Sequence, residues 1–317
     1  MIYKEETKIT SRWIEAKRGE KNNVNPHRPY AWLVEKEHTL SGKVEDTATI
    51  FLTNRECSFK CLMCDLWKNT TDETVPIGAI PEQIEWALEQ MPPAKHLKLY
   101  NSGSFFDKNA IPVEDYPRIA ALVKNFETVI VESHTQYIGK NCLKLKALLQ
   151  PELQVALGLE TVHPEVLQKL NKKMSLDAFK NSIEFLDENK IPTRAFILLR
   201  PPFMTEDEGI LWAKKSIDFA FKTGVECCIV IPVRAGNGAM DVLVKRGDFT
   251  PPKIQSLETV LKYGIELNAG RVFADTWDLH LFSNCVKCVD QRIEKITAMN
   301  LSQRVEKQIE CTCNSFR

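Results

Sequence analysis

The chain has 317 residues, 44% of them hydrophobic and 26% charged, which is typical of a globular protein that buries a core without staples. Lys plus Arg and Asp plus Glu both number 42, so a zero formal charge argues against a large, uniformly basic surface for nucleic acid. Residues 1–20 lack the apolar core of a signal peptide, and no apolar run is long enough for a membrane span. The ten cysteines occur at clustered spacings that favour metal ligation over disulfides, which predicts a reducing, cytoplasmic location.

The first 45 residues are polar and show no strong periodic pattern beyond a short helix at residues 12–17. We expect this segment to pack across the fold or to cover a sheet edge. From residue 47 onward, predicted strands and helices alternate. The strands are predicted at residues 47–53, 96–100, 128–132, 154–159, 192–199 and 226–233, and the helices at residues 81–90, 116–125, 141–149, 175–189, 205–222 and 252–267. Thr205 and Glu208 form a capping-box pattern at the start of the fifth of these helices.

Six strand–helix units predict a parallel sheet with helices packed against it. Since six units fall short of a closed eight-fold barrel, the expected fold class is α/β, a partial (β/α)6 TIM-like barrel over residues 46–270. In this scheme residues 1–45 are an N-terminal extension. Residues 271–317, with a helix at residues 291–299, form a small C-terminal module that contains four cysteines.

Three cysteines, Cys57, Cys61 and Cys64, follow the first predicted strand with the spacing C-x3-C-x2-C. Loops after the strands form the active face of an α/β barrel, and thiolates are the soft ligands that iron–sulfur clusters need. Three thiolates hold three irons of a 4Fe–4S cluster and leave the fourth iron open to a small molecule. The alternative is a zinc site completed by a distant His or Cys.

The segment that carries these cysteines, Asn54-Arg55-Glu56-Cys57-Ser58-Phe59-Lys60-Cys61-Leu62-Met63-Cys64-Asp65, resembles the signature of the radical SAM superfamily. The resemblance extends over roughly residues 47–317 and departs from the signature at Met63, where that superfamily often has an aromatic residue. It implies a cytoplasmic enzyme that uses a 4Fe–4S cluster and S-adenosylmethionine (SAM) to generate a 5′-deoxyadenosyl radical. It also implies an electron donor of the flavodoxin or ferredoxin type. A different class of function, a non-catalytic, redox-responsive iron–sulfur or zinc protein, would bind no SAM.

The segment after the second strand occupies the place of the superfamily's glycine-rich SAM-binding motif. Its candidate residues are Asn101, Ser102, Gly103 and Ser104. Gly103 lets the backbone approach a ligand, and exposed backbone groups there suit the amino and carboxylate ends of the methionine moiety. A plain turn is the structural alternative.

Further candidates lie at the ends of later strands. Glu132 ends the third strand and is followed by His134, a possible proton donor. The element Gly158-Leu159-Glu160-Thr161 is similar to one in the elongator catalytic subunit and the coproporphyrinogen dehydrogenases, which implies that Glu160 lies near the SAM ribose; a surface salt bridge is the alternative. Arg194 and Arg200 flank the fifth strand, and either could neutralise the SAM carboxylate through a bidentate contact; Arg200 is the candidate cofactor-binding residue.

Residues 97–106, together with the C-terminal cysteines, are similar to the radical SAM subunit of archaeosine synthase. This resemblance implies cleavage of a C–N bond in a lysine adduct of a deazaguanine base in tRNA. The partner would then be tRNA or a tRNA-modifying protein that carries the adduct. Radical chemistry on another small molecule or on a peptide remains the alternative, because no residue here names the substrate.

The C-terminal module contains Cys285-x2-Cys288 and Cys311-x-Cys313. Two such pairs suit a tetrahedral zinc site with four thiolate ligands, which would staple the last loop and helix to the barrel. An auxiliary 4Fe–4S cluster and four unligated thiols are the alternatives.

Overall fold

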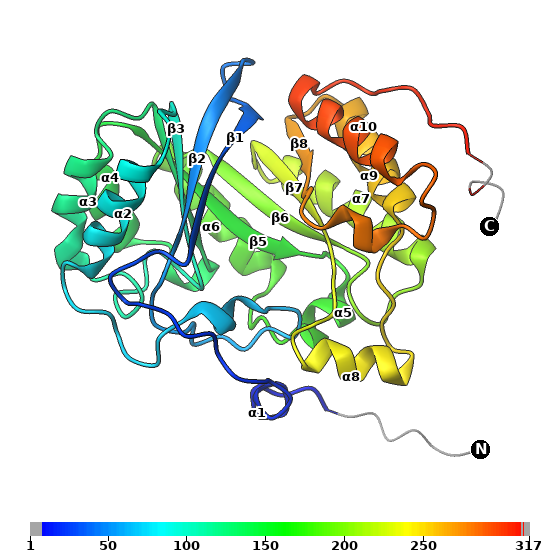
Figure 1. The fold of residues 1–317 in the computed structure, drawn as a ribbon, viewed down its shortest axis with the longest axis horizontal. Coiled ribbons are helices and arrows are strands. Elements are labelled where there is room, and N and C mark those ends of the chain that lie inside the picture. Colours follow the sequence, from blue (N-terminus) through cyan, green and yellow to red (C-terminus); the bar gives the residue numbers. More distant parts are fainter. Residues whose placement is uncertain (1–7, 312, 314–317) are drawn as a thin grey trace.

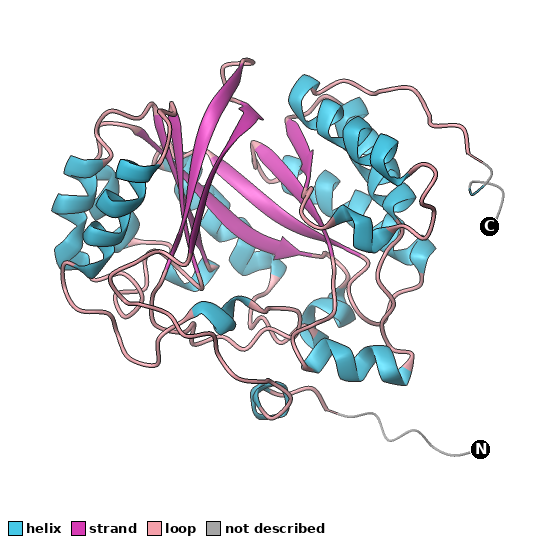
Figure 2. Cartoon of the chain, viewed as in Figure 1, coloured by secondary structure: helices cyan, strands magenta, loops and turns pink. Residues whose placement is uncertain are grey.

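The computed structural model describes residues 8–311 and 313. In this part of the chain, one curled sheet of eight strands runs in the order β1 to β8, and helices cover its convex face (Figures 1 and 2). β1 pairs with β2 in antiparallel fashion, and every later neighbour is parallel. The strands are β1 (Ala31–His38), β2 (Val44–Leu52), β3 (His96–Asn101), β4 (Thr128–Ser133), β5 (Glu152–Glu160), β6 (Thr193–Leu199), β7 (Cys227–Pro232) and β8 (Arg271–Ala274). The α/β class and the partial TIM-like barrel are therefore confirmed.

Two strands were not predicted. β1 lies within the first 45 residues, where no element beyond a short helix was expected, and it forms one edge of the sheet. Ala31, Trp32, Glu35 and Lys36 of this strand are exposed, and its second half is charged. It therefore lacks the continuous apolar run of a strand that is buried on both faces. β8 at the other edge has only four residues, which is too short for a periodic signal.

The helices alternate with the strands as predicted. They are α1 (Ser11–Glu15), α2 (Ala79–Gln90), α3 (Tyr116–Leu122), α4 (Lys140–Leu148), α5 (Pro164–Lys169), α6 (Leu176–Glu188), α7 (Glu206–Lys222), α8 (Ala239–Arg246), α9 (Ile254–Leu267) and α10 (Val289–Ser302). Short 3-10 helices lie at Leu66–Asn69, Val113–Asp115, Thr135–Tyr137 and Leu279–Phe282. α5 and α8 were not predicted; both lie in loops at the carboxyl ends of the strands, below the sheet in Figure 1.

The alternation of side chains along each strand separates the core from the concave face. In β3, Leu97 and Leu99 are buried in the apolar core that joins the sheet to its helices. Lys98 and Tyr100, one residue out of phase, line a cavity on the concave face. The period of two therefore places every second residue of a barrel strand where a ligand can meet it.

α10 covers the free edge of β8. The side-chain amide of Asn300 donates to the Ala274 carbonyl over 2.8 Å and accepts from the Ala274 N–H over 2.9 Å. Gln303 makes the same pair of bonds to Val272, at 3.0 and 2.9 Å. The Leu301 carbonyl lies 2.9 Å from His38 Nδ1, at the end of β1. α10 thus bridges the two edge strands across the opening of the partial barrel.

Within the described part of the chain, no helix combines the length and the apolar character that a bilayer crossing requires.

The capping box of α7 gives a first testable expectation. The Glu208 N–H donates to Thr205 Oγ1 over 3.3 Å, and the Glu208 carboxylate accepts from the Thr205 N–H over 2.8 Å. Thr205→Ala removes one of these bonds and should lower the free energy of unfolding by about 1 kcal/mol, whereas Thr205→Ser should retain most of it. Urea denaturation of the three proteins measures the difference, and an alanine variant as stable as the serine variant would contradict the assignment.

Candidate active site

The concave face of the sheet encloses one large cavity of about 680 Å³. At the carboxyl ends of the strands, the loops after β2, β3, β4, β5, β7 and β8 contribute to its lining. The three cysteines of the loop after β2 all line this cavity, as do Ser102, Gly103, Glu132 and Glu160. The structure therefore brings together most of the site residues that the sequence singled out from separate strand ends.

Three asparagine side chains hold the loop of Cys57, Cys61 and Cys64 in place. Asn54 accepts from the Ser102 N–H over 3.1 Å and donates to the Ser102 carbonyl over 3.3 Å. Asn171 donates to the Lys60 carbonyl over 2.7 Å, and Asn237 donates to the carbonyls of Leu62 (2.8 Å) and Cys64 (3.1 Å). Asn54 belongs to the loop and ties it to the segment after β3, whereas Asn171 and Asn237 reach it from distant parts of the chain, so the backbone between the cysteines is fixed by tertiary contacts rather than by secondary structure.

The Leu62 N–H also donates to the Leu170 carbonyl over 2.9 Å, and the ring of Phe59 stacks on His134 with centroids 3.8 Å apart. These contacts tie the same loop to the segments after α5 and β4. The loop that carries the thiols is therefore held by contacts with several other loops of the barrel.

The spacing of the three thiols distinguishes a cluster from a single ion. All three residues are described, yet their sulfur atoms do not all lie within 4.8 Å of one another. A tetrahedral zinc ion with 2.3 Å bonds needs sulfurs about 3.8 Å apart. Thiolates that hold three corners of a cluster must lie farther apart, so this arrangement fits a 4Fe–4S cluster better than the zinc alternative.

Gly103 leaves room beside the first cysteine. Its φ is +138°, and a Cβ there would lie 3.1 Å from Cys57 Cβ and 3.3 Å from Cys57 Sγ. Glycine is thus required both by the backbone conformation and by the closeness of the thiol. The loop after β3 and the cysteine loop meet at this point.

The three thiols are partly buried in the cavity wall. Burial raises the pKa of Cys61 to about 11 and also raises the pKa of Cys57 and Cys64. At neutral pH these groups stay protonated until a cation binds, so metal loading must release their protons.

A buried ion pair lies next to the cysteine loop. Lys172 Nζ is 2.5 Å from Glu160 Oε1, and both residues line the cavity. A Cβ on Gly158 would lie 2.2 Å from that carboxylate and 2.3 Å from that ammonium, so a side chain at position 158 would displace the pair from its present position. Burial alone would lower the pKa of Lys172, but Glu160 and the neighbouring Cys61 outweigh burial and raise it.

Glu160 itself has a left-handed backbone, with φ of +65°, at the point where the pairing of β5 with β6 shifts register. Such a conformation is uncommon outside glycine, and backbone strain of this kind concentrates at functional sites. The sequence predicted Glu160 as a site residue but gave no sign of Lys172, which follows an unpredicted helix.

The remaining candidates of the third strand and the SAM-binding segment lie around Glu132. Its Oε1 accepts from the Asn101 N–H over 2.8 Å, and burial raises the pKa of its carboxyl to about 8. The side-chain amide of Asn101 is buried and finds no partner among the described residues, which is the condition of a group that awaits a water or a ligand. Ser104 lies behind the cavity wall, where its hydroxyl accepts from the His134 N–H over 2.8 Å.

His134 lines the cavity, but its ring is fully engaged. Nδ1 accepts from the Gln136 N–H over 3.1 Å, and Nε2 lies 3.0 Å from the Lys172 carbonyl. Burial and the nearby Lys172 lower its pKa to about 4, so the ring is neutral at physiological pH. This bonding suits a positioning role more than the proton donation that its place in the sequence suggested.

The two arginines that flank the fifth strand lie elsewhere. Arg200 lies outside the cavity lining, and its Nη1 contacts Glu206 at 2.6 Å and the Pro251 carbonyl at 3.0 Å. Arg194 lines the cavity at the amino end of β6, where it contacts Glu37 at 2.6 Å. The structure thus does not bring Arg200 to the other candidates. Lys172 and Arg18 are the cations that line the cavity beside the cysteine loop, and Arg18 pairs with Glu56 of that loop at 2.7 Å.

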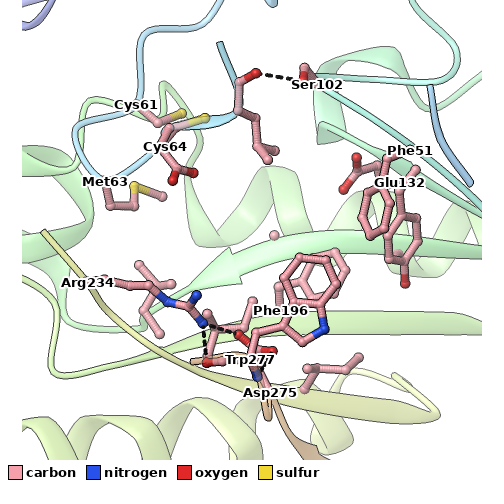
Figure 3. A pocket seen from close by; sticks show the side chains of 18 of the residues that line it. Phe51, Cys61, Met63, Cys64, Ser102, Glu132, Phe196, Arg234, Asp275 and Trp277 are labelled. Atoms are coloured by element: carbon pink, nitrogen blue, oxygen red, sulfur yellow. Dashed lines mark hydrogen bonds and ion pairs between the residues drawn. The ribbon is translucent and has the colours of Figure 1, made fainter. Parts of the chain in front are cut away.

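Aromatic rings line the cavity across from the thiols. Figure 3 shows Cys61, Cys64 and Met63 on one side and Phe51, Phe196 and Trp277 on the other. The rings of Phe51 and Trp277 lie 5.4 Å apart. Arg234 fixes the loop of Trp277 by bonds of 2.8 Å to Asp275 and 2.9 Å to the Trp277 carbonyl. The resulting walls offer flat apolar surfaces to a ligand.

The cysteines of the C-terminal module also come together, outside the barrel. Cys285, Cys288, Cys311 and Cys313 have sulfur atoms that all lie within 4.8 Å of one another. The sequence prediction of a shared metal site is consistent with this clustering.

No family model matches the chain. An uncharacterised protein of Methanocaldococcus jannaschii is 24% identical over 92% of this chain and 86% of its own length. The archaeosine synthase beta subunits of Thermococcus kodakarensis and Methanosarcina acetivorans are 28% and 22% identical, over 57% and 70% of this chain and 60% and 68% of their own lengths. The chain is a distant homologue of those subunits.

Two solved structures share the fold. Methylornithine synthase superposes with a TM-score of 0.52 and 15% identity, over 78% of this chain and 80% of its own. Elp3 of Methanocaldococcus infernus gives 0.51 and 14%, over 71% of this chain and 59% of its own. The fold is radical SAM-like. The radical SAM-like barrel and its cavity thus provide the frame for the cysteine loop.

The close approach of Gly103 to Cys57 gives a testable expectation for this barrel. Gly103→Ala should cost about 1 kcal/mol of stability through its positive φ and, in addition, lose most of the iron bound after anaerobic reconstitution. Gly42→Ala is the matched control, because Gly42 has φ of +77° with no atom within 4 Å of its Cβ position. Iron analysis should separate the two variants, and equal iron in both would contradict the steric account.

The raised pKa of Glu132 gives an expectation for pH. Its folded pKa of about 8 lies above the ordinary 4.5, so between these values the folded chain holds one proton more than the unfolded chain. Stability should therefore fall as pH rises through this window, by up to about 1.4 kcal/mol per pH unit, and level off above it. Glu132→Gln should remove this fall. Melting temperatures of both proteins across the window test it, and parallel pH profiles would contradict the shifted pKa.

Proposed function

We propose that the protein is a radical SAM enzyme whose cluster is held by Cys57, Cys61 and Cys64. The observation that carries the proposal is the set of three thiols that line the cavity, with sulfurs that do not all lie within 4.8 Å of one another, on the carboxyl-end loop of a radical SAM-like barrel. Such a cluster, when bound, supplies one electron that cleaves the S–C5′ bond of SAM and yields a 5′-deoxyadenosyl radical. A donor of the flavodoxin or ferredoxin type would supply that electron.

The chain's own residues bind and orient the cosubstrate in this proposal. Gly103 and Ser102, which line the cavity beside Cys57, present backbone groups to the methionine end, while Asn101 and Ser104 support that segment from behind. Lys172 supplies the positive charge for the carboxylate, in place of the predicted Arg200. Glu160 accepts hydrogen bonds from the ribose hydroxyls.

Glu132, neutral at physiological pH because of its raised pKa, can donate a hydrogen bond as well as accept one. The rings of Phe51, Phe196 and Trp277 exclude water from the part of the cavity next to the bound cosubstrate. A radical formed there would meet the substrate rather than solvent.

For the substrate we propose a modified deazaguanine base in tRNA, with cleavage of a C–N bond as in archaeosine formation. The support is distant homology to archaeosine synthase beta subunits, together with a cavity whose rings suit a planar base. The chain carries no net charge to attract tRNA, so a partner protein that binds the tRNA is part of the proposal.

The radical chemistry is tested with anaerobically reconstituted protein, dithionite and SAM. Wild type should release 5′-deoxyadenosine, and Cys61→Ala should release none because one iron loses its ligand. Cys142→Ala is the matched control. Cys142 lies on α4 and is buried in the apolar core, so this variant should release 5′-deoxyadenosine as wild type does. Release by Cys61→Ala at the wild-type rate would refute the assignment.

The substrate is tested separately, with tRNA that carries the lysine adduct of deazaguanine. Release of 5′-deoxyadenosine should rise when this tRNA is added, and the adduct should lose its lysine-derived part. Unstimulated release with an unchanged adduct would reject this substrate and leave the radical SAM assignment intact.

A further inference from the structure

The four cysteines of the C-terminal module form a second site, in which the sulfur atoms lie closer together than those of the three barrel cysteines. Cys285 and Cys288 lie in the turn that starts α10, where the Cys288 N–H donates to the Cys285 carbonyl over 3.4 Å. Cys311 and Cys313 come from the segment that follows α10. Cys285 Sγ is 3.7 Å from Cys311 Sγ, and Cys288 Sγ is 3.5 Å from Cys313 Sγ.

These distances match the ligands of one tetrahedral ion. Zinc–sulfur bonds of about 2.3 Å place the four sulfurs about 3.8 Å from one another. A four-iron cluster puts a cube of irons and sulfides between its thiolates and needs a wider opening. The barrel trio, whose sulfurs are not all within 4.8 Å, shows the wider arrangement in the same chain.

The charges around the site suit an anionic centre. Four thiolates around a divalent ion carry a net charge of −2, which needs a cation nearby. Arg292, only 1% exposed, donates to Cys288 Sγ over 3.3 Å and to the Glu258 carboxylate over 2.6 Å. A buried guanidinium within bonding distance of a sulfur is the kind of partner that orients a metal ligand.

The four-cysteine site lies at the start of α10, a helix whose other end lines the cavity. α10 begins at Cys288 as its N-cap, and its far end carries Asn300 and Leu301, both of which line the cavity. The bonds of Asn300 and Gln303 to β8 fix that far end. An ion at the cysteines would fix the near end.

We propose that Cys285, Cys288, Cys311 and Cys313 hold a single zinc ion, not an auxiliary iron–sulfur cluster, and that this ion locks α10 against the barrel as a wall of the cavity. Zinc has no redox chemistry, so the site takes no part in electron transfer. The inference goes beyond the proposed function and does not depend on it, because it concerns a separate set of ligands.

The test uses the full chain purified without oxygen. Elemental analysis of wild type should find about one zinc per chain in addition to the iron of the barrel cluster. The double variant Cys311→Ser/Cys313→Ser should lose the zinc and keep the iron and its electron paramagnetic resonance signal. Cys61→Ala should show the reverse, with zinc retained and iron lost.

Loss of iron in the double variant would overturn the proposal in favour of a cluster at this site. Wild type with iron above the content of one cluster and no zinc would overturn it as well. So would a metal-free site with two disulfides, seen as a mass lower by four hydrogens in the intact chain. These last two outcomes are read on wild type, so they hold even if the variant folds poorly.

The role of the ion is tested by hydrogen exchange. Removal of zinc from wild type with a chelator should speed amide exchange in residues 289–302 and 271–274 by about tenfold or more, and leave α2 unchanged. Exchange in α10 that does not respond to zinc would overturn the claim that the ion locks this wall.

Discussion

The loop between β2 and the 3-10 helix at Leu66–Asn69 depends on bonds from the rest of the barrel, and the proposed chemistry depends on that loop. No regular secondary structure holds Cys57, Cys61 and Cys64 where they are. Asn171 and Asn237, from distant parts of the chain, donate to carbonyls of the loop, and Asn54 of the loop bonds to the backbone of Ser102 after β3. Because every such bond needs the folded barrel, the spacing of the thiols is a property of the whole fold.

Charge pairing shapes the rest of the cavity. Glu37, at the amino ends of the strands, lies 2.5 Å from Lys98 and 2.6 Å from Arg194. Burial opposes its ionisation, but the two cations hold its pKa well below the usual range. Lys172 is paired with Glu160, and Arg234 with Asp275. These charges are paired within the protein. The part of the cavity between the Glu37 cluster, at the amino ends of the strands, and the thiols is therefore bounded mainly by aromatic and apolar side chains.

Sequence reasoning predicted what depends on local pattern. The strands β2 to β7 are largely buried, rich in aliphatic and β-branched residues and separated by helices, so they were found with small errors at their ends. β1 is half exposed and charged, and β8 has four residues, so neither gave such a signal. The cysteine groups were found because their spacing alone carries meaning.

What the sequence missed depends on tertiary contacts. Asn171 and Lys172 follow α5 and reach the cysteine loop only in the folded chain, so no motif marks them. Arg200 sits at a strand end as predicted, but its backbone φ of +52° and its bond to Glu206 take its side chain away from the cavity. A strand end predicts where a residue lies, and the neighbours decide where its side chain points.

The central claim is that three thiolates leave one iron open to SAM. The most direct measurement is the electron paramagnetic resonance spectrum of the anaerobically reconstituted, dithionite-reduced protein, recorded with and without SAM. The account predicts a reduced 4Fe–4S signal whose shape changes on addition of SAM, because the cosubstrate binds the open iron. A signal that SAM leaves unchanged, or the absence of any cluster signal in protein with all three cysteines intact, would contradict it.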